Sequence, residues 1–130
     1  MNNELVDLLN TLLEAEKAGV ETMAYLLDKE PNNELFKEVK NDEAWSCAGL
    51  IQSIKREGGT VSTAKGDFAD KVRALPTIQE QLDLLCKGQA WVVRRIDRAL
   101  PLEMSGETRT FLEEMKKKHE VNISNVEQGI

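Results

Sequence analysis

The stretch TVSTAKGDFADKVRALP, residues 60–76, decides the fold, because it joins two pairs of helical segments by the longest connection in the chain. It is rich in Thr, Ser and Gly, which interrupt helical periodicity, and only the part from Asp67 to Leu75 predicts a short helix. A connection of this length can run along a whole bundle of helices, which distinguishes a crossover topology from the simple up-and-down one. An up-and-down bundle with a decorated loop is the alternative.

Four longer segments flank this connection and carry the periodicity of amphipathic helices. Pro31 ends the first segment, because proline disfavours helix in the residue before it, and Gly58 ends the second. Thr77 can cap the third, with Glu80 placed as the return partner of a capping box. The predicted helices run from Asn3 to Lys29, from N-cap Asn32 or Asn33 to Glu57, from Thr77 to Ala99, and from just after Gly106 to about Val126.

Strand-like alternation is nowhere sustained, so the sequence predicts an all-α fold. The turns within each pair of helices are short, which makes those neighbours antiparallel. The predicted architecture is therefore a four-helix bundle with one long crossover connection between the second and third helices.

Length, charge and cysteine content exclude several classes of protein. The chain has 130 residues and a net charge of −6, which suits one domain over residues 1–130 and argues against nucleic-acid binding. Its first residues lack the positive flank of a signal peptide, and no apolar run is long enough to cross a membrane. Cys47 and Cys86 form no CxxC pair. We therefore expect a cytoplasmic protein with reduced thiols and no membrane or nucleic-acid partner.

Each long helix has its apolar stripe interrupted by polar residues near its middle. The interruptions are Glu16 in the first helix, Glu43 and Ser46 in the second, Gln89 in the third, and Lys116 and His119 in the fourth. The midpoints of bundled helices lie at one height, so these side chains are predicted to meet in one buried layer. Because burying an unpaired charge is costly, they should satisfy each other or a bound ion.

These positions resemble the ligand set of the ferritin-like carboxylate proteins, rubrerythrin among them. That family builds a di-iron site from a Glu on each of two helices and a Glu-x-x-His on each of the other two. Glu16 and Gln89 match the two single glutamates, while EAWS at residues 43–46 and KKKH at residues 116–119 match the two Glu-x-x-His motifs. The resemblance implies a ferritin-like four-helix bundle and, as is common in such proteins, a homodimer.

The departures from the family pattern indicate that the di-iron site is lost. Ser46 replaces a histidine, Gln89 replaces a carboxylate, and Lys116 replaces another carboxylate with a cation. An ammonium close to two divalent irons in a poorly solvated interior is strongly unfavourable. We expect Lys116 to donate to Glu16 and Glu43 instead, with Gln89 and Ser46 completing a metal-free polar network.

Two functions follow from this layer. In the first, the protein is a non-catalytic binding or structural module without a cofactor. In the second, it is a metal-binding, oxidoreductase-like protein that holds a single divalent metal ion with Glu16, Glu43 and His119. The second requires Lys116 to turn away from the layer. No particular substrate or small-molecule ligand is indicated by the sequence.

Several residues flank the layer. Cys47 and Cys86 could be soft ligands or redox thiols, but free cysteines at such positions are usually small buried hydrophobes. Glu14 and Glu21 lie off the apolar stripe and are expected to be solvated, although a small rotation of the helix would bring Glu21 into the layer.

Three glycines lie inside the predicted helices near the layer, at positions 19, 49 and 88. Glycine costs roughly 1 kcal/mol relative to alanine in a helix interior, so each needs a reason to be there. Close packing of neighbouring helices is one reason. A pocket beside the layer, open to a small ligand, is the other.

Overall fold

The computed structural model describes residues 3–129, and within that range helices are the only regular secondary structure and no strand is present. The helices are α1 (Asn3–Lys29), α2 (Glu34–Arg56), α3 (Phe68–Arg73), α4 (Ile78–Ala99) and α5 (Gly106–Gly129). The predicted all-α class is confirmed. The long helices begin and end close to the predicted residues, except that α5 continues to Gly129, beyond the predicted end at Val126.

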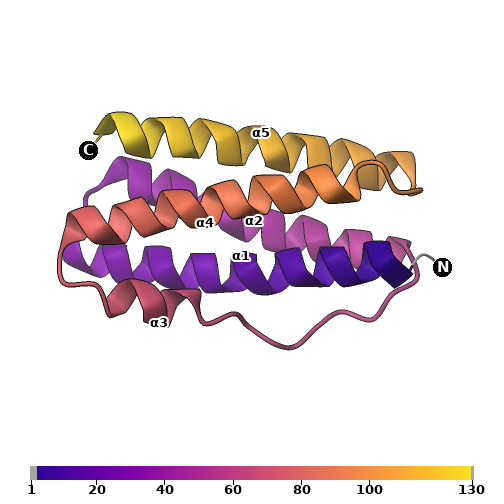
Figure 1. The fold of residues 1–130 in the computed structure, drawn as a ribbon, viewed down its shortest axis with the longest axis horizontal. Coiled ribbons are helices and arrows are strands. Elements are labelled where there is room, and N and C mark those ends of the chain that lie inside the picture. The colour runs from indigo at the N-terminus through magenta and orange to yellow at the C-terminus, as the bar shows by residue number, and fades with distance from the viewer. Residues whose placement is uncertain (1–2, 130) are drawn as a thin grey trace.

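The four long helices lie side by side, and the connection between α2 and α4 runs back along the molecule (Figure 1). Because of this return, α2 and α4 point in the same direction, while α1 and α2, and likewise α4 and α5, are antiparallel. The short helix α3 lies in the second half of the connection and packs against both α1 and α4. The helix α3 thus covers one side of the contact between α1 and α4.

Side-chain caps explain where α2, α4 and α5 begin. The side chain of Asn33 accepts a hydrogen bond from the backbone N–H of Phe36, and Thr77 accepts one from Glu80. The hydroxyl of Thr77 also donates to the Glu80 carboxylate. In a capping box that carboxylate would accept from the backbone N–H of Thr77, so here it binds the side chain of the cap residue instead. Ser105 accepts in the same way from the N–H of Thr108, at the start of α5. Each cap satisfies a donor that the first turn of a helix leaves free.

Helix α2 ends where the sequence predicts, at the Gly58–Gly59 pair. Gly58 has a φ of 83°, a left-handed backbone conformation that residues other than glycine rarely adopt. The following N–H of Gly59 bonds back to the carbonyl of Ile54 at 2.9 Å, which closes the last turn of the helix. The chain then leaves α2 and enters the long connection.

The core consists of two apolar clusters. The larger contains Leu5, Leu9, Leu12, Leu13, Leu50, Ile54, Val92, Ile96, Ala99, Leu112 and Met115. The smaller contains Met23, Leu26, Phe36, Val39, Leu85 and Val126. Along each long helix the two clusters are separated by a buried polar residue, so the core is divided by a polar layer. Burial of each large apolar side chain contributes about 1.5–3 kcal/mol, which holds the helices together on both sides of that layer.

None of the helices in the described part of the chain is both long and apolar enough to cross a membrane.

Candidate functional site

Five of the six predicted layer residues are buried; one of them is Ser46, and the other four come one from each long helix. Glu16 on α1 and His119 on α5 are 1% and 0% exposed, and Glu43 on α2 and Gln89 on α4 are 3% and 5% exposed. Their positions follow from the local sequence, because each sits on the stripe of its helix that faces the core. The structure connects them as two hydrogen-bonded pairs.

The first pair joins His119 to Glu16. The ring Nε2 lies 2.5 Å from Oε1 of Glu16, and the ring Nδ1 lies 2.9 Å from the carbonyl oxygen of Met115. A carbonyl oxygen only accepts, so Nδ1 carries a proton and donates it. The Glu16–His119 contact therefore shares one further proton between Nε2 and the carboxylate.

The ionised form of this pair is favoured by its surroundings. Burial alone would lower the pKa of His119, but the negative charge of Glu16, the hydrogen bonds to Glu16 and Met115, and the charge of Asp42 together raise it above its ordinary value. A raised pKa favours the positively charged form of the ring. The pair is thus a buried ion pair between α1 and α5.

The second pair joins Gln89 to Glu43. The amide Nε2 of Gln89 donates to Oε2 of Glu43 at 3.2 Å. Burial, followed by the negative charge of Glu16, raises the pKa of Glu43 well above its ordinary value, although the bond from Gln89 opposes the shift. The neutral, protonated form of Glu43 is therefore favoured beside the ion pair of Glu16 and His119.

The two pairs leave three oxygens in the layer without a partner. Oε2 of Glu16, Oε1 of Glu43 and Oε1 of Gln89 are all buried and form no hydrogen bond with any described residue. Buried polar atoms in folded proteins are almost always paired, and each exception requires an explanation. The layer therefore has unused capacity to accept hydrogen bonds.

A pocket of about 510 Å³ is lined by the three residues that carry these oxygens. Glu16, Glu43 and Gln89 are among its polar lining residues, which also include Thr11, Glu14, Asp67, Lys71, Lys87 and Arg94. Phe68 of α3 and Trp91 of α4 are among its apolar lining residues. The volume is in the range of pockets that hold small organic molecules, and a mostly apolar wall with a few convergent polar groups is their usual construction.

Lys116 does not join the layer, and the predicted network around it is wrong. Its ammonium forms an ion pair with Asp97 of α4 at 2.8 Å, at the half-exposed edge of the α4–α5 contact. The pKa of Lys116 is raised above its ordinary value, mainly by the hydrogen bond to Asp97. The inward position one turn before His119 belongs to Met115, which is fully buried. The buried face of α5 includes Leu112, Met115, His119, Asn122 and Val126, so it keeps the predicted His119 and has Met115 in place of Lys116.

Ser46 is buried in α2 as predicted, but its hydroxyl is used locally. It donates to the carbonyl of Asp42 at 3.0 Å, which is the bond that a serine inside a helix commonly makes to the preceding turn. It forms no hydrogen bond to Glu43 or Gln89 in the described structure. The donors that satisfy the carboxyl groups are thus the ring of His119 and the amide of Gln89.

Both cysteines are free thiols that pack against the apolar clusters. Burial and the negative charges of Glu16 and Glu43 raise the pKa of Cys47 to about 12, so its thiol stays protonated. Burial raises the pKa of Cys86 as well, and the nearby Glu127 and Asp83 contribute. Neither thiol has the lowered pKa that marks a reactive cysteine.

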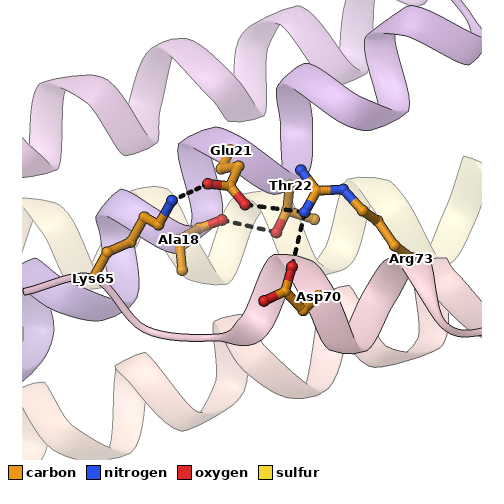
Figure 2. Close-up of polar contacts among 6 residues, drawn as sticks. All are labelled: Ala18, Glu21, Thr22, Lys65, Asp70 and Arg73. Atoms are coloured by element: carbon orange, nitrogen blue, oxygen red, sulfur yellow. Dashed lines mark hydrogen bonds and ion pairs between the residues drawn. The ribbon is translucent and has the colours of Figure 1, made fainter.

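Glu14 and Glu21 are not simply solvated, as the sequence had indicated, but bind the long connection. The carboxylate of Glu14 accepts a hydrogen bond from the hydroxyl of Ser62 at 2.6 Å. Glu21 forms ion pairs with Lys65 and with Arg73, whose guanidinium also contacts Asp70 (Figure 2). These bonds attach the connection to the outer face of α1 on both sides of Phe68. Glu21 thereby helps to position the pocket wall rather than joining the layer.

Two of the helix-interior glycines line the pocket, and the third allows two helices to pack closely. A Cβ atom at Gly19 would lie 1.9 Å from Oε2 of Glu43, and one at Gly88 would lie 2.8 Å from the ring of Phe68. Both glycines line the pocket and make room for one of its other walls. A Cβ at Gly49 would instead meet the ring of Phe111 at 2.0 Å, where α2 and α5 pack together. Both sequence-based explanations for these glycines apply, at different positions.

One polar contact near the layer was missed from the sequence. The side chain of Asn122, one turn after His119, donates to the carboxylate of Asp42 at 3.1 Å. Asn122 is buried at a position of α5 that an apolar residue would otherwise fill. A polar residue on the apolar face of a predicted helix is the sequence feature that could have identified it. Asp42 thus lies close enough to His119 and Glu43 to act on both electrostatically.

The residues present do not fit the di-iron group that the ferritin-like resemblance implies. Nε2 of His119, the atom that would bind a metal, is engaged by Glu16, and an amide and a hydroxyl stand at two other ligand positions. Across residues 3–129, no three His, Cys, Asp or Glu side chains are grouped so that they could hold a metal ion. The single-metal set of Glu16, Glu43 and His119 is not assembled in this geometry either. With Lys116 outside the layer, its charge is not what makes the site unsuitable.

Comparison with known proteins gives a family but no activity. Residues 3–128 match a family described as a domain of unknown function, DUF6306. No curated protein and no solved structure matches the chain.

Proposed function

The chain belongs to the DUF6306 family of domains of unknown function, and we propose that it is a non-catalytic module that binds a small organic molecule in the pocket beside its polar layer. The observation that carries this proposal is the combination of a pocket of about 510 Å³ with three unpartnered buried oxygens in its wall residues. Empty buried acceptors are costly, and a ligand that donates to them removes that cost.

We further infer that the architecture is a ferritin-like four-helix bundle with one long crossover connection, between α2 and α4. The parallel directions of α2 and α4 support this topology (Figure 1). The buried polar residue near the middle of each long helix supports it as well, because ferritin-like proteins place their metal ligands there. In this chain an ion pair and an amide–carboxyl pair occupy the level of the ancestral metal site.

A binding role is better supported than a catalytic one by the chemistry of the polar layer and of the pocket beside it. His119 is the only histidine, and both of its ring nitrogens are engaged. Cys47 is a protonated thiol, and Glu43 is a neutral acid held by Gln89. A general base needs a free lone pair within reach of its substrate, and a nucleophile needs an activating base. Glu16 keeps one unpartnered oxygen, but no hydroxyl or thiol among the described pocket residues is hydrogen-bonded to a side-chain base that could activate it.

The test is a fragment screen followed by nuclear magnetic resonance on ¹⁵N-labelled protein. Binding in the pocket should shift the backbone amides of Gly88 and Gln89 and the side-chain amide of Gln89. The variant Ala15→Leu fills the pocket from α1 and should abolish these shifts, whereas Ala48→Leu, at an exposed position of α2, should leave them unchanged. Fragments that bind equally well to Ala15→Leu, or no fragment binding at all, would contradict the proposal.

A further inference from the structure

The oxygens left free in the polar layer define what the head group of a ligand must supply. Glu16, Glu43 and Gln89 each have one buried oxygen without a hydrogen-bond partner, and all three residues line the same pocket. Oxygens of carboxylates and amides accept hydrogen bonds. A ligand group that only donates is the complement of such a set, and a primary ammonium, with three donors and no acceptor, matches it in number.

The charges around these oxygens favour a single positive charge. The carboxylate of Glu16 is already balanced by the ring of His119. Glu43 has no cationic side chain within ion-pair distance among the described residues, and its nearest charged neighbours include the acidic Glu16 and Asp42. Burial favours a proton on Glu43 in the unliganded chain, and a cationic head group would displace that proton and supply the one positive charge that the carboxylate needs. A monovalent head group supplies it, while a divalent cation would exceed it.

The rest of the pocket describes the body of the ligand. Phe68, Trp91, Val92 and Ala15 present apolar surface from α3, α4 and α1. A volume of about 510 Å³ is far larger than an ammonium ion, so most of the bound molecule lies against these apolar groups. The exposed Lys87 and Arg94 also line the pocket and have no ion-pair partner among the described residues, and the charged residues Glu14, Asp67 and Lys71 line it as well.

We propose that the pocket binds a small organic amine, with a primary ammonium head held by Glu16, Glu43 and Gln89 and a short apolar body held between α1, α3 and α4. This inference rests on the proposed binding function and names the chemical class of its ligand. The head group donates to three oxygens that otherwise remain unpaired in a poorly solvated site, where hydrogen bonds to charged groups are strongest. Phe68 covers the body, in the place that Gly88 leaves open for its ring.

Three six-carbon probes that differ only in the head group test the assignment. Hexylamine, hexan-1-ol and hexanoate are titrated into the full chain, with calorimetry for affinity and the amide signals of Gly88 and Gln89 for location. Hexylamine, which is protonated at neutral pH, should bind at least about tenfold more tightly than hexan-1-ol, and hexanoate should not bind measurably. Zinc chloride is titrated separately to test for a divalent metal ion.

A variant with nearly the same shape tests the role of the head-group oxygens. Glu43→Gln replaces a carboxyl by an amide and should weaken hexylamine at least about tenfold while leaving hexan-1-ol within about twofold. Glu113→Gln, at an exposed position of α5, is the matched control and should change neither affinity. An equal loss for both probes in Glu43→Gln would mean that the variant has altered the pocket as a whole and would overturn the specific role of Glu43.

The outcomes separate the ligand class from the binding function. If hexan-1-ol or hexanoate binds in the pocket as tightly as hexylamine, the amine assignment is wrong and the binding function stands. The assignment is also wrong if zinc shifts the Gln89 signals at lower concentration than hexylamine does. If neither these probes nor the fragments bind, both the assignment and the binding function fail.

Discussion

Nε2 of His119 lies 2.5 Å from Oε1 of Glu16, and this buried contact joins α5 to α1 across 103 residues of sequence. Both side chains are removed from solvent, so neither charge can be stabilised by water. The carbonyl of Met115 holds the other ring nitrogen and orients the imidazole toward Glu16. The hydrogen bond to Glu16 therefore engages Nε2, the only ring nitrogen that would otherwise be available to a metal ion.

The Glu16–His119 pair predicts a strongly non-additive double-mutant cycle. His119→Leu leaves the carboxylate of Glu16 buried without its partner and should reduce the free energy of unfolding by about 3–5 kcal/mol. The double variant Glu16→Leu/His119→Leu should be more stable than His119→Leu alone, because the unpaired charge is also removed. Urea unfolding measures all four proteins. Additive effects would show that the two side chains do not interact in solution.

The pKa shifts of Glu43 and His119 predict that stability falls as the pH rises. Both groups bind their proton more tightly in the folded chain than at their ordinary pKa values of 4.5 and 6.5. Their contribution is fully present below those values and is lost as the pH rises through the folded pKa values. In Glu43→Gln the residue no longer titrates, so the loss of stability from about pH 5 to about pH 8 should be less steep. Equal slopes in urea unfolding for the variant and the wild type would contradict the shift of Glu43.

Lys116 is predicted to be a minor contributor to stability, in contrast to the role that its sequence position indicated. Its partner Asp97 is about half exposed, with 49% of its side-chain area accessible, and solvent screens such a pair. Lys116→Met should therefore shift the midpoint of urea unfolding no further than Asp97→Asn does. A large shift for Lys116→Met alone would indicate that its ammonium acts inside the layer.

Gly19→Ala is predicted to destabilise the fold although alanine is the better helix former. The added Cβ would lie 1.9 Å from Oε2 of Glu43, so that carboxyl group must move and its bond from Gln89 must distort. Overpacking of this kind costs about 1–3 kcal/mol, more than the roughly 1 kcal/mol gained in helix propensity. In a Glu43→Ala background the same substitution should be neutral or stabilising. Thermal unfolding of the four proteins checks this, and a destabilisation that persists without Glu43 would locate the clash elsewhere.

Much of the fold could be predicted because its determinants are local. Asn33, Gly58 and Thr77 mark helix ends by their own backbone and side-chain chemistry, and the structure places the ends there. Glu16, Glu43, Gln89 and His119 could be identified because a polar residue on an apolar stripe stands out by periodicity alone.

The remaining features depend on contacts that periodicity does not report. Met115 and Lys116 are consecutive residues of α5, about 100° apart around the helix, and the periodicity of the sequence does not decide which of them points inward. The packing of α5 against α4 buries the methionine and lets the lysine reach Asp97. The role of Glu21 depends on where the connection runs, and that segment has no repeat from which its path could be inferred. The pocket is lined by residues of α1, α2, α3 and α4, so the helix-interior glycines alone could not establish that it exists.

The central claim is that an ion pair, not a metal, occupies the layer beside the pocket, and the ring of His119 reports on it directly. His119 is the only histidine, so its ring nitrogens can be observed without ambiguity by ¹⁵N nuclear magnetic resonance. We predict that both nitrogens carry a proton at neutral pH and that the spectrum is the same with added zinc or ferrous ion and with a chelator. An Nε2 without a proton, whose signal shifts when metal is added and returns when it is removed, would contradict the account.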